Sequence, residues 1–276
     1  MKTYDEFLAQ VKKNKSMPGF SKTQLRGQYK GQCELLRLFK IVIEFCDKNN
    51  LHYFATGGTL LGSVRENGFI PHDADIDIAL VDEEYDYFYR NFPKNNESFH
   101  LSNYSTDPKI LEELYGPSNP YYVGDVSSDG KSYVGTINRV VSKKWIYNPW
   151  VQNAGRQSRL PYHCGVRVDI FKFSSCAKTD FLIPTWKGNE WKTWREKKFK
   201  LKKEELFPLK KSKFEDIDIN IPNREDIWLK SSWGADYMKP KKNGYPHEYP
   251  TDGKISELDP ANLPPMYKKH YNHLYE

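Results

Sequence analysis

In one short stretch of the chain, residues 75–81, which reads DIDIALV, the large apolar residues Ile76, Ile78 and Leu80 alternate with Asp75, Asp77 and Ala79. Because strand side chains alternate between two faces, the isoleucines and Leu80 share one face, and Asp75 and Asp77 share the other. The two carboxylates are then about 6.5 Å apart, close enough to converge on one or two hard cations. Without a cation they would repel each other. The pattern therefore predicts a strand with a cation site on one face.

The residues before this strand predict a first strand, a glycine turn and a short helix. The strand covers residues 51–55, and in the Gly57-Gly58 pair that follows, the missing Cβ atoms allow a sharp turn and a close approach to a ligand. A helix is predicted from Thr59 to about Glu66. Its free N–H groups and dipole make a candidate anion site, with Thr59 Oγ1 as one more donor. A plain turn without a ligand is the alternative interpretation.

Periodicity predicts further elements on both sides of this unit. Helical spacing of apolar residues marks residues 22–49 as a core helix behind the acidic strand, and residues 82–92 as a second helix. Strand patterns cover residues 133–141, 144–147 and 166–173. Between them, residues 95–129 are rich in Ser, Asn, Pro and Tyr and are predicted to be a variable loop.

One carboxylate interrupts the apolar pattern of the strand predicted at 166–173. Asp169 shares its face with Arg167 and Phe171. A single Asp among apolar residues is destabilising unless it is paired or binds a metal. Two interpretations therefore stay open, a metal ligand and a structural carboxylate paired with Arg167 or Arg139.

The C-terminal part of the chain carries a basic and aromatic stretch, residues 186–213. It is crowded with lysines and interleaved with Trp and Phe. We expect a Lys/Trp-rich helix with a solvated basic face, although nucleic acid, an anionic glycan or membrane phosphates are alternative partners. Residues 216–218 repeat the acidic alternation without a glycine turn and are predicted to form a hairpin edge. The final 36 residues are polar and are predicted to wrap the surface.

Composition narrows the class of partner. The net charge of +6 fits anionic substrates such as nucleotide diphosphates, but it is too small and too dispersed to indicate nucleic acid. The four cysteines lack the close spacing of a zinc site, so reduced core thiols and no structural zinc are expected.

The first twenty residues contain no long apolar run, so neither a signal peptide nor a membrane anchor is predicted. A cytoplasmic location is expected if the sequence is complete, and a Golgi or secretory lumen if it has been trimmed. Peripheral contact with a membrane stays open.

A calcium loop is the main alternative for the acidic residues. Asp73, Asp75, Asp77 and Glu84 fall at positions 1, 3, 5 and 12 of an EF-hand count. The sixth position, which needs Gly, is Ile78, and the intervening residues have the pattern of a strand. The EF-hand is therefore disfavoured, and a solvated acidic strand without an ion stays open.

A longer motif surrounds these residues, namely GGTLLGSVRENGFIPHDADIDIAL. It resembles the signature of the LicD/fukutin family, in which a Gly-Thr-Leu-Leu-Gly segment, an Arg, a Gly-Phe-Ile-Pro turn and an Asp-rich strand follow one another. The resemblance implies an α+β fold, a nucleotidyltransferase-like mixed β-sheet flanked by helices, with a C-terminal Lys/Trp-rich helical extension. It also implies an N-terminal extension (1–21), a catalytic core (22–180) and a C-terminal part (181–276) packed on that core as one compact unit.

The family is known for phosphotransferases that move phosphocholine, ribitol phosphate or a sugar phosphate from a nucleotide diphosphate donor to a glycan. The resemblance therefore implies an enzyme of this type, with a CDP-linked donor favoured and a GDP-sugar as the alternative. A nucleotidyltransferase that releases pyrophosphate, and a non-catalytic metal-binding or partner-binding protein, are the other functions considered.

The resemblance also implies roles for individual residues. Asp75, Asp77 and Asp169 would hold Mg²⁺ or Mn²⁺, one ion on the donor pyrophosphate and another about 3.5–4 Å away that activates the acceptor hydroxyl. Asp73 would be the base or an outer-shell ligand.

Five residues are implied to bind the nucleotide or its phosphates: Gly57, Gly58, Thr59, Arg65 and His72. The three at the turn would cradle donor phosphate, and Arg65 would neutralise charge on the leaving nucleotide. His72 stands where Trp is more common in the family, and Ala74 where Asp is, so the donor base stays open.

Overall fold

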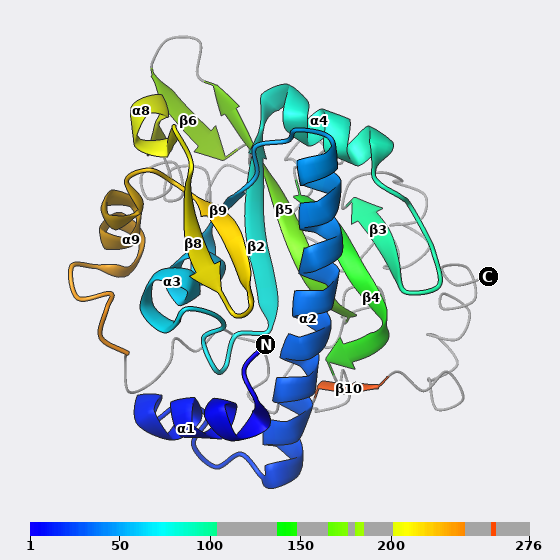
Figure 1. The fold of residues 1–276 in the computed structure, drawn as a ribbon, viewed down its shortest axis with the longest axis vertical. Helices are drawn as coiled ribbons and strands as arrows, with labels where there is room; N and C mark the ends of the chain where they lie inside the picture. Colours follow the sequence, from blue (N-terminus) through cyan, green and yellow to red (C-terminus); the bar gives the residue numbers. More distant parts are fainter. Residues whose placement is uncertain (104–136, 148–164, 176–179, 185–200, 241–254, 258–276) are drawn as a thin grey trace, which may run out of the picture.

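A mixed β-sheet with the long helix α2 (Lys22–Lys48) across one face forms the centre of the fold (Figure 1). The computed structural model describes residues 1–103, 137–147, 165–175, 180–184, 201–240 and 255–257. Within these residues there are six helices and an eight-stranded sheet, which confirms the predicted α+β class. The sheet contains β1 (Phe54–Ala55), β2 (Asp75–Val81), β3 (Phe99–Asn103), β4 (Ile137–Tyr147), β5 (Gly165–Ser175), β6 (Phe181–Pro184), β7 (Leu201–Lys202) and β10 (Ile255–Glu257).

The order of the central strands is β1-β2-β5-β4-β10. β2 and β5 are parallel, and the other pairs are antiparallel. This register places Asp77 opposite Asp169, and Arg139 of β4 opposite Asp169 on the other side. The sheet therefore brings together acidic and basic residues that are far apart in the sequence.

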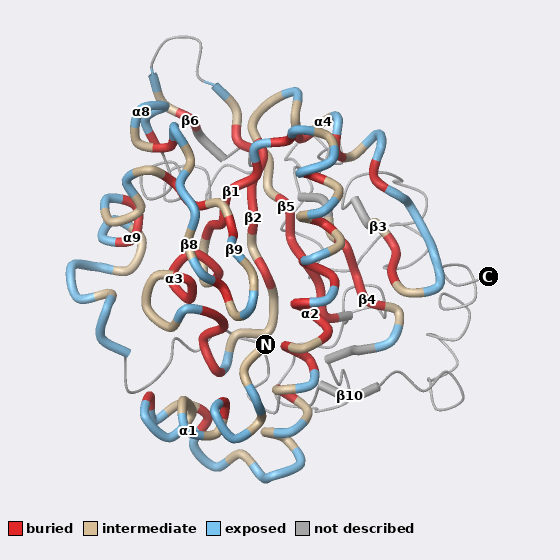
Figure 2. Tube along the Cα trace, viewed as in Figure 1, coloured by how far each residue is buried: buried red, intermediate tan, exposed pale blue. Residues whose placement is uncertain are grey.

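Helix α2 begins at a capping box, in which Ser21 Oγ accepts from the Gln24 N–H and the Gln24 side chain accepts from the Ser21 N–H. Its apolar stripe is buried against the sheet, as predicted. Figure 2 shows that buried residues concentrate in the central strands, in α3 and along one side of α2. Cys33 and Cys46 of this helix are free thiols, Cys46 being buried, whereas the other two cysteines lie outside the described residues.

Helix α1 (Tyr4–Asn14) lies within the N-terminal extension, where no element was predicted. Thr3 and Glu6 form its capping box, a signal that is present in the sequence. The helix docks through two amides, because Gln10 Nε2 and Asn14 Nδ2 each donate to the Glu66 carboxylate at 3.0 Å. The extension therefore packs on the end of α3 (Gly57–Glu66).

A two-stranded hairpin, β8 (Lys210–Phe214) and β9 (Ile217–Ile221), lies beside α3 and confirms the hairpin predicted there. Phe214 packs edge-on against Phe69 and Phe39, with ring centroids 4.8 and 6.0 Å away. At the hairpin turn, the buried Glu215 carboxylate accepts from the Phe69 N–H at 3.1 Å. The hairpin thus fixes the turn that leads from α3 to the acidic strand.

The remaining elements are α4 (Asp82–Asn91), α8 (Lys203–Leu206) and α9 (Glu225–Trp233). The helix predicted after the acidic strand is α4. Of the helix predicted for the basic stretch, residues 186–200 lie outside the described residues. Residues 201–213 do not continue it, because they form β7, the short α8 and most of β8, and Pro208 follows α8.

Two loop predictions also need revision. The loop predicted over residues 95–129 contains β3, which pairs with β4, and its residues from 104 onward lie outside the described part. Most of the final 36 residues are likewise outside it, but β10 adds a strand to the edge of β4. None of the helices in the described segments is both long and apolar enough to cross a membrane.

Candidate functional site

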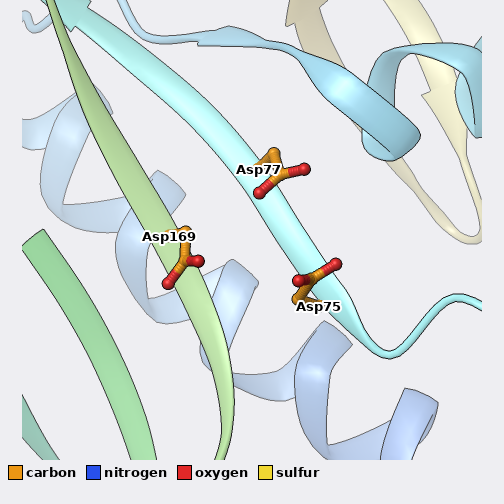
Figure 3. Close-up of side chains that lie close together, drawn as sticks. All are labelled: Asp75, Asp77 and Asp169. Atoms are coloured by element: carbon orange, nitrogen blue, oxygen red, sulfur yellow. The ribbon is translucent and has the colours of Figure 1, made fainter. Parts of the chain in front are cut away.

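Three carboxylates converge where β2 and β5 run side by side. Asp75 and Asp77 leave the same face of β2, and Asp169 leaves β5 next to them (Figure 3). One oxygen atom from each of the three lies within 4.8 Å of the others. The predicted trio therefore forms a single cluster, because the parallel pairing of β2 with β5 sets Asp77 directly beside Asp169.

Burial and negative charge act together on the carboxylates of this cluster. Burial raises the pKa of Asp77 well above its usual range, and the negative charges of Asp75, Asp169 and Asp73 raise it further. Burial and the neighbouring Asp75 raise the pKa of Asp73 in the same way. A divalent cation among these oxygen atoms would relieve the repulsion, and carboxylate oxygens are the ligands that Mg²⁺ and Mn²⁺ prefer. The donor set thus fits the predicted cofactor.

Two arginines contact Asp169 as well. Arg139 Nε and Arg167 Nε each donate to Asp169 Oδ1 at 3.1 Å, and Arg167 Nη2 lies 3.9 Å from Asp75 Oδ2. Asp169 and Arg167 are 4% and 7% exposed, so these contacts are shielded from solvent. The ion pair considered as the alternative for Asp169 is therefore present, and it occurs together with the carboxylate cluster. The two arginines orient the Asp169 carboxylate, and Arg167 also lies close to Asp75.

The glycine turn packs directly against the acidic residues. Gly57 has a left-handed φ of 51°, and a Cβ there would collide with the Asp77 carboxylate. A Cβ on Gly58 would collide with the Asp73 carboxylate. The first turn of α3 thus faces both carboxylates, and the helix begins at Gly57, two residues earlier than predicted. A donor phosphate at this turn would lie beside the cluster. The phosphate-binding role of the glycines stays a prediction.

Thr59 ties the helix to the acidic strand. It is 2% exposed, and its Oγ1 accepts from the Asp77 N–H at 2.8 Å. The Thr56 N–H donates to the Asp77 carbonyl at 3.0 Å. The backbone of Asp77 is therefore held at both its N–H and its C=O, and Thr59 acts first as an anchor for this residue. Its predicted contact with phosphate stays a prediction.

Two glutamines of α2 hold the turn that carries His72 and Asp73. Gln32 Nε2 donates to the carbonyl oxygens of Ile70, Pro71 and Asp73 at 3.0, 3.1 and 3.0 Å. Gln28 Nε2 donates to the Asp73 carbonyl at 2.7 Å. Sequence reasoning missed both glutamines, although a buried amide within the apolar stripe of a core helix is a signal that such a side chain has a specific partner.

Arg65 lies at the C-terminal end of α3, away from the glycine turn. Its Nε donates to Glu66 Oε1 at 2.9 Å, and its Nη1 donates to the Tyr237 carbonyl at 3.0 Å. Its charge is therefore shared with Glu66, and it links α3 to the segment after α9. Its predicted role toward the leaving nucleotide is not tested by these contacts.

A pocket of about 60 Å³ lies beside the cluster and unites most of the predicted nucleotide-binding residues. Gly58, Arg65, His72 and Asp73 all line it. Trp233, the last residue of α9, and three residues that follow this helix also line it: Tyr237, Lys239 and Pro240. Sequence reasoning did not assign these four residues to the site, because they are distant in sequence from α3.

Comparison with known proteins points to the part of the chain that carries the glycine turn and the acidic strand. Residues 50–111 match the family model described as LicD/FKTN/FKRP, nucleotidyltransferase domain, which confirms the resemblance to the LicD/fukutin family. The match covers the glycine turn and the aspartates of β2, whereas Asp169 lies beyond it.

Three relatives align with parts of the chain. The lipopolysaccharide cholinephosphotransferase LicD of Haemophilus influenzae is 37% identical over 72 residues, 26% of this chain and 26% of its own. An uncharacterised protein of Rickettsia typhi is 42% identical over 60 residues, 22% of this chain and 19% of its own. An uncharacterised protein of Caenorhabditis elegans is 58% identical over 36 residues, 13% of this chain and 10% of its own. The aligned regions thus span only a minor part of each relative.

Proposed function

We propose, from the premise that residues 50–111 are a LicD/FKTN/FKRP nucleotidyltransferase domain, that this protein is a metal-dependent phosphotransferase. It moves a phosphorylated group, such as phosphocholine, ribitol phosphate or a sugar phosphate, from a nucleotide diphosphate donor to a hydroxyl group of a glycan. A CDP-linked donor is favoured. The observation that carries the proposal is the convergence of Asp75, Asp77 and Asp169 beside the glycine turn.

The three carboxylates would hold Mg²⁺ or Mn²⁺, which would supply charge stabilisation for the phosphates and lower the pKa of the acceptor hydroxyl. Arg139 and Arg167 support this role, because their hydrogen bonds fix the direction of the Asp169 carboxylate. Thr59 and Thr56 do the same for the backbone of Asp77.

The acceptor hydroxyl oxygen attacks the distal phosphorus of the donor. The bond from that phosphorus to the bridging oxygen breaks, and a nucleoside monophosphate leaves with the bonding electrons. Asp73 is assigned to receive the hydroxyl proton, since its carboxylate lies over the first turn of α3 near Asp75. The N–H groups of Gly57 and Gly58 bind the charge on the transferred phosphate.

Isothermal titration with CDP, CMP, GDP and UDP, each with and without Mn²⁺, tests the proposal. We expect one nucleotide to bind in the presence of Mn²⁺ and to lose this binding in Asp75→Asn. Strong metal binding with no nucleotide binding would instead favour the non-catalytic metal-binding function.

The products separate the two reaction classes. Release of CMP from a CDP-linked donor supports attack on the distal phosphorus, as proposed. Release of pyrophosphate from CTP would mean attack on the proximal phosphorus, and the protein would then be a nucleotidyltransferase.

A further inference from the structure

One end of the chain carries almost all of the excess positive charge. Residues 1–30 contain seven lysines and arginines and two acidic residues, so they have a net charge of +5, against +6 for the whole chain. The rest of the chain is therefore almost neutral. The sequence alone does not show whether these cations share one surface, because they are spread over α1, a loop and the start of α2.

The fold brings these segments together. Figure 1 shows α1 and the first turns of α2 at the lower end of the molecule, joined by the loop of residues 15–21. Tyr4 packs against Tyr29 of α2, with ring centroids 5.3 Å apart, and the Arg26 guanidinium lies 5.7 Å from the centroid of the Tyr4 ring. Phe7 of α1 is fully buried. The apolar side of α1 is thus turned inward, which leaves its basic residues on the outside.

The exposed cations at this end form a cluster that we call the basic surface: Lys12, Lys13, Lys15, Lys22, Arg26 and Lys30. Within the described part of the chain, the first four make no ion pair. The exposed Lys213 of the hairpin, by contrast, pairs with Asp218 at 2.8 Å. The two acidic residues of the segment, Asp5 and Glu6, lie in the first turn of α1, at the other end of that helix from its lysines. The basic surface therefore has positive charge available for an anionic partner.

Two features of the loop and of the helix that follows it are unfavourable for folding alone. Lys22 is the first residue of α2, where the positive end of the helix dipole disfavours a cation, and the first turn has no acidic residue. Phe20 is only partly buried, and it ends the exposed Pro18-Gly19 tip between Lys15 and Lys22. An aromatic ring flanked by lysines suits a membrane interface, because the ring can enter the headgroup region while the ammonium groups meet phosphates.

From these observations we propose that the basic surface binds the phosphate headgroups of an anionic membrane. Five of its six cations are lysines, which act as point charges, whereas nucleic-acid recognition more often uses the planar fork of arginine. The cations are spread over two helices and the loop between them, which suits an extended plane of headgroups. Asn14 and Ser16 also line the pocket beside the acidic cluster, so a protein held by the basic surface would keep its candidate site next to the membrane.

Co-sedimentation with lipid vesicles tests the proposal. We expect the unmodified protein to bind vesicles of equal parts phosphatidylglycerol and phosphatidylcholine, to leave pure phosphatidylcholine vesicles unbound, and to be released at high salt, since salt screens exposed charges. The test variant combines Lys12→Gln, Lys13→Gln, Lys15→Gln and Lys22→Gln. Each lysine close to an anionic membrane changes the affinity about five-fold. The affinity of the variant should therefore fall by at least about 100-fold.

The matched control replaces four exposed lysines of the C-terminal part by Gln: Lys203, Lys211, Lys213 and Lys230. It has the same net charge as the test variant, and it should bind the anionic vesicles like the unmodified protein. All eight replaced side chains are exposed, so both variants should unfold at the same temperature as the unmodified protein.

Three outcomes would overturn the proposal. The first is failure of the unmodified protein to bind anionic vesicles. The second is equal loss of binding in the two variants, because net charge and not the basic surface would then be responsible. The third is binding of a soluble polyanion, heparin, through the four N-terminal lysines without binding to vesicles, which would assign the surface to an anionic glycan. The vesicles are titrated without nucleotide or metal, so each of these outcomes leaves the proposed phosphotransferase function standing.

Discussion

The two glycines of the turn offer a matched pair of substitutions. Gly57→Ala and Gly58→Ala each add one methyl group, and each methyl group meets a carboxylate, that of Asp77 or that of Asp73. The backbones differ, because Gly57 has a φ of 51° and Gly58 does not have a left-handed φ. Gly57→Ala therefore combines backbone strain with displacement of a metal ligand, Asp77. Gly58→Ala adds a side chain of the same size without either effect.

The left-handed conformation destabilises Ala by about 1–2 kcal/mol relative to its preferred conformations. At Gly58, within the helix, Ala is intrinsically more favourable than Gly by up to about 1 kcal/mol, which offsets the displacement of Asp73. We therefore expect Gly57→Ala to be less stable than Gly58→Ala by about 2 kcal/mol. For a chain of this size that is a difference of about 4–8 °C in Tm.

The carboxylate displaced in Gly57→Ala belongs to Asp77, whose backbone cannot retreat because Thr59 and Thr56 hold it. Gly57→Ala should therefore also lose the rise in Tm produced by Mn²⁺, whereas Gly58→Ala should keep it. Thermal unfolding with and without Mn²⁺ measures both effects. Equal Tm values for the two variants, or a full Mn²⁺ effect in Gly57→Ala, would refute the argument.

Three further predictions concern charge, backbone support and pH. Asp77→Asn removes one of several repelling carboxylates, so the metal-free variant should be as stable as the unmodified protein or more stable. Calorimetry should show that it no longer binds Mn²⁺, and an unfolded variant would contradict this prediction. Gln32→Leu leaves buried carbonyls without their donor, so urea unfolding should show a free energy of unfolding lower by about 2–4 kcal/mol, together with weaker Mn²⁺ binding. Loss of stability with unchanged Mn²⁺ binding would limit Gln32 to a structural role. Burial, and secondarily the charge of Lys143, lowers the pKa of His100 from 6.5 to about 4, so the unfolded chain takes up this proton first as the pH falls. The stability that neutral His100 provides above pH 6.5 should therefore be lost between pH 6.5 and 4, by about 3 kcal/mol, and His100→Gln should lack this component in urea titrations at several pH values.

Local patterns in the sequence predicted the elements that carry the site. The alternation in residues 75–81 predicted β2 with the same bounds that the structure has, and α3 ends at Glu66, as predicted. The hairpin after the basic stretch and the helix behind the acidic strand follow from equally local periodicity. The start of α3 was missed by two residues, because the helix propensity of Gly57 and Gly58 does not decide whether they belong to the helix.

The family match covers a continuous stretch of sequence, residues 50–111, and the site residues within this stretch could therefore be assigned from the sequence. The strand pattern singled out Asp169 as a metal ligand or a paired carboxylate, but only the resemblance joined it to Asp75 and Asp77, because nothing in its own strand shows which neighbours it has. The parallel pairing of β5 with β2 and the antiparallel pairing with β4 place it among Asp77, Arg139 and Arg167.

The sequence by itself therefore determined the elements that carry the site, the turn beside the acidic strand and the chemical types of the ligands. The tertiary structure alone decided which distant side chains meet there: the glutamines of α2 on the Asp73 turn, and Trp233 and Tyr237 in the same pocket as residues of α3. The physical reason is that periodicity and turn preference arise from neighbours along the chain. The convergence of side chains depends instead on strand order, register and helix packing, which arise from contacts between residues far apart in sequence.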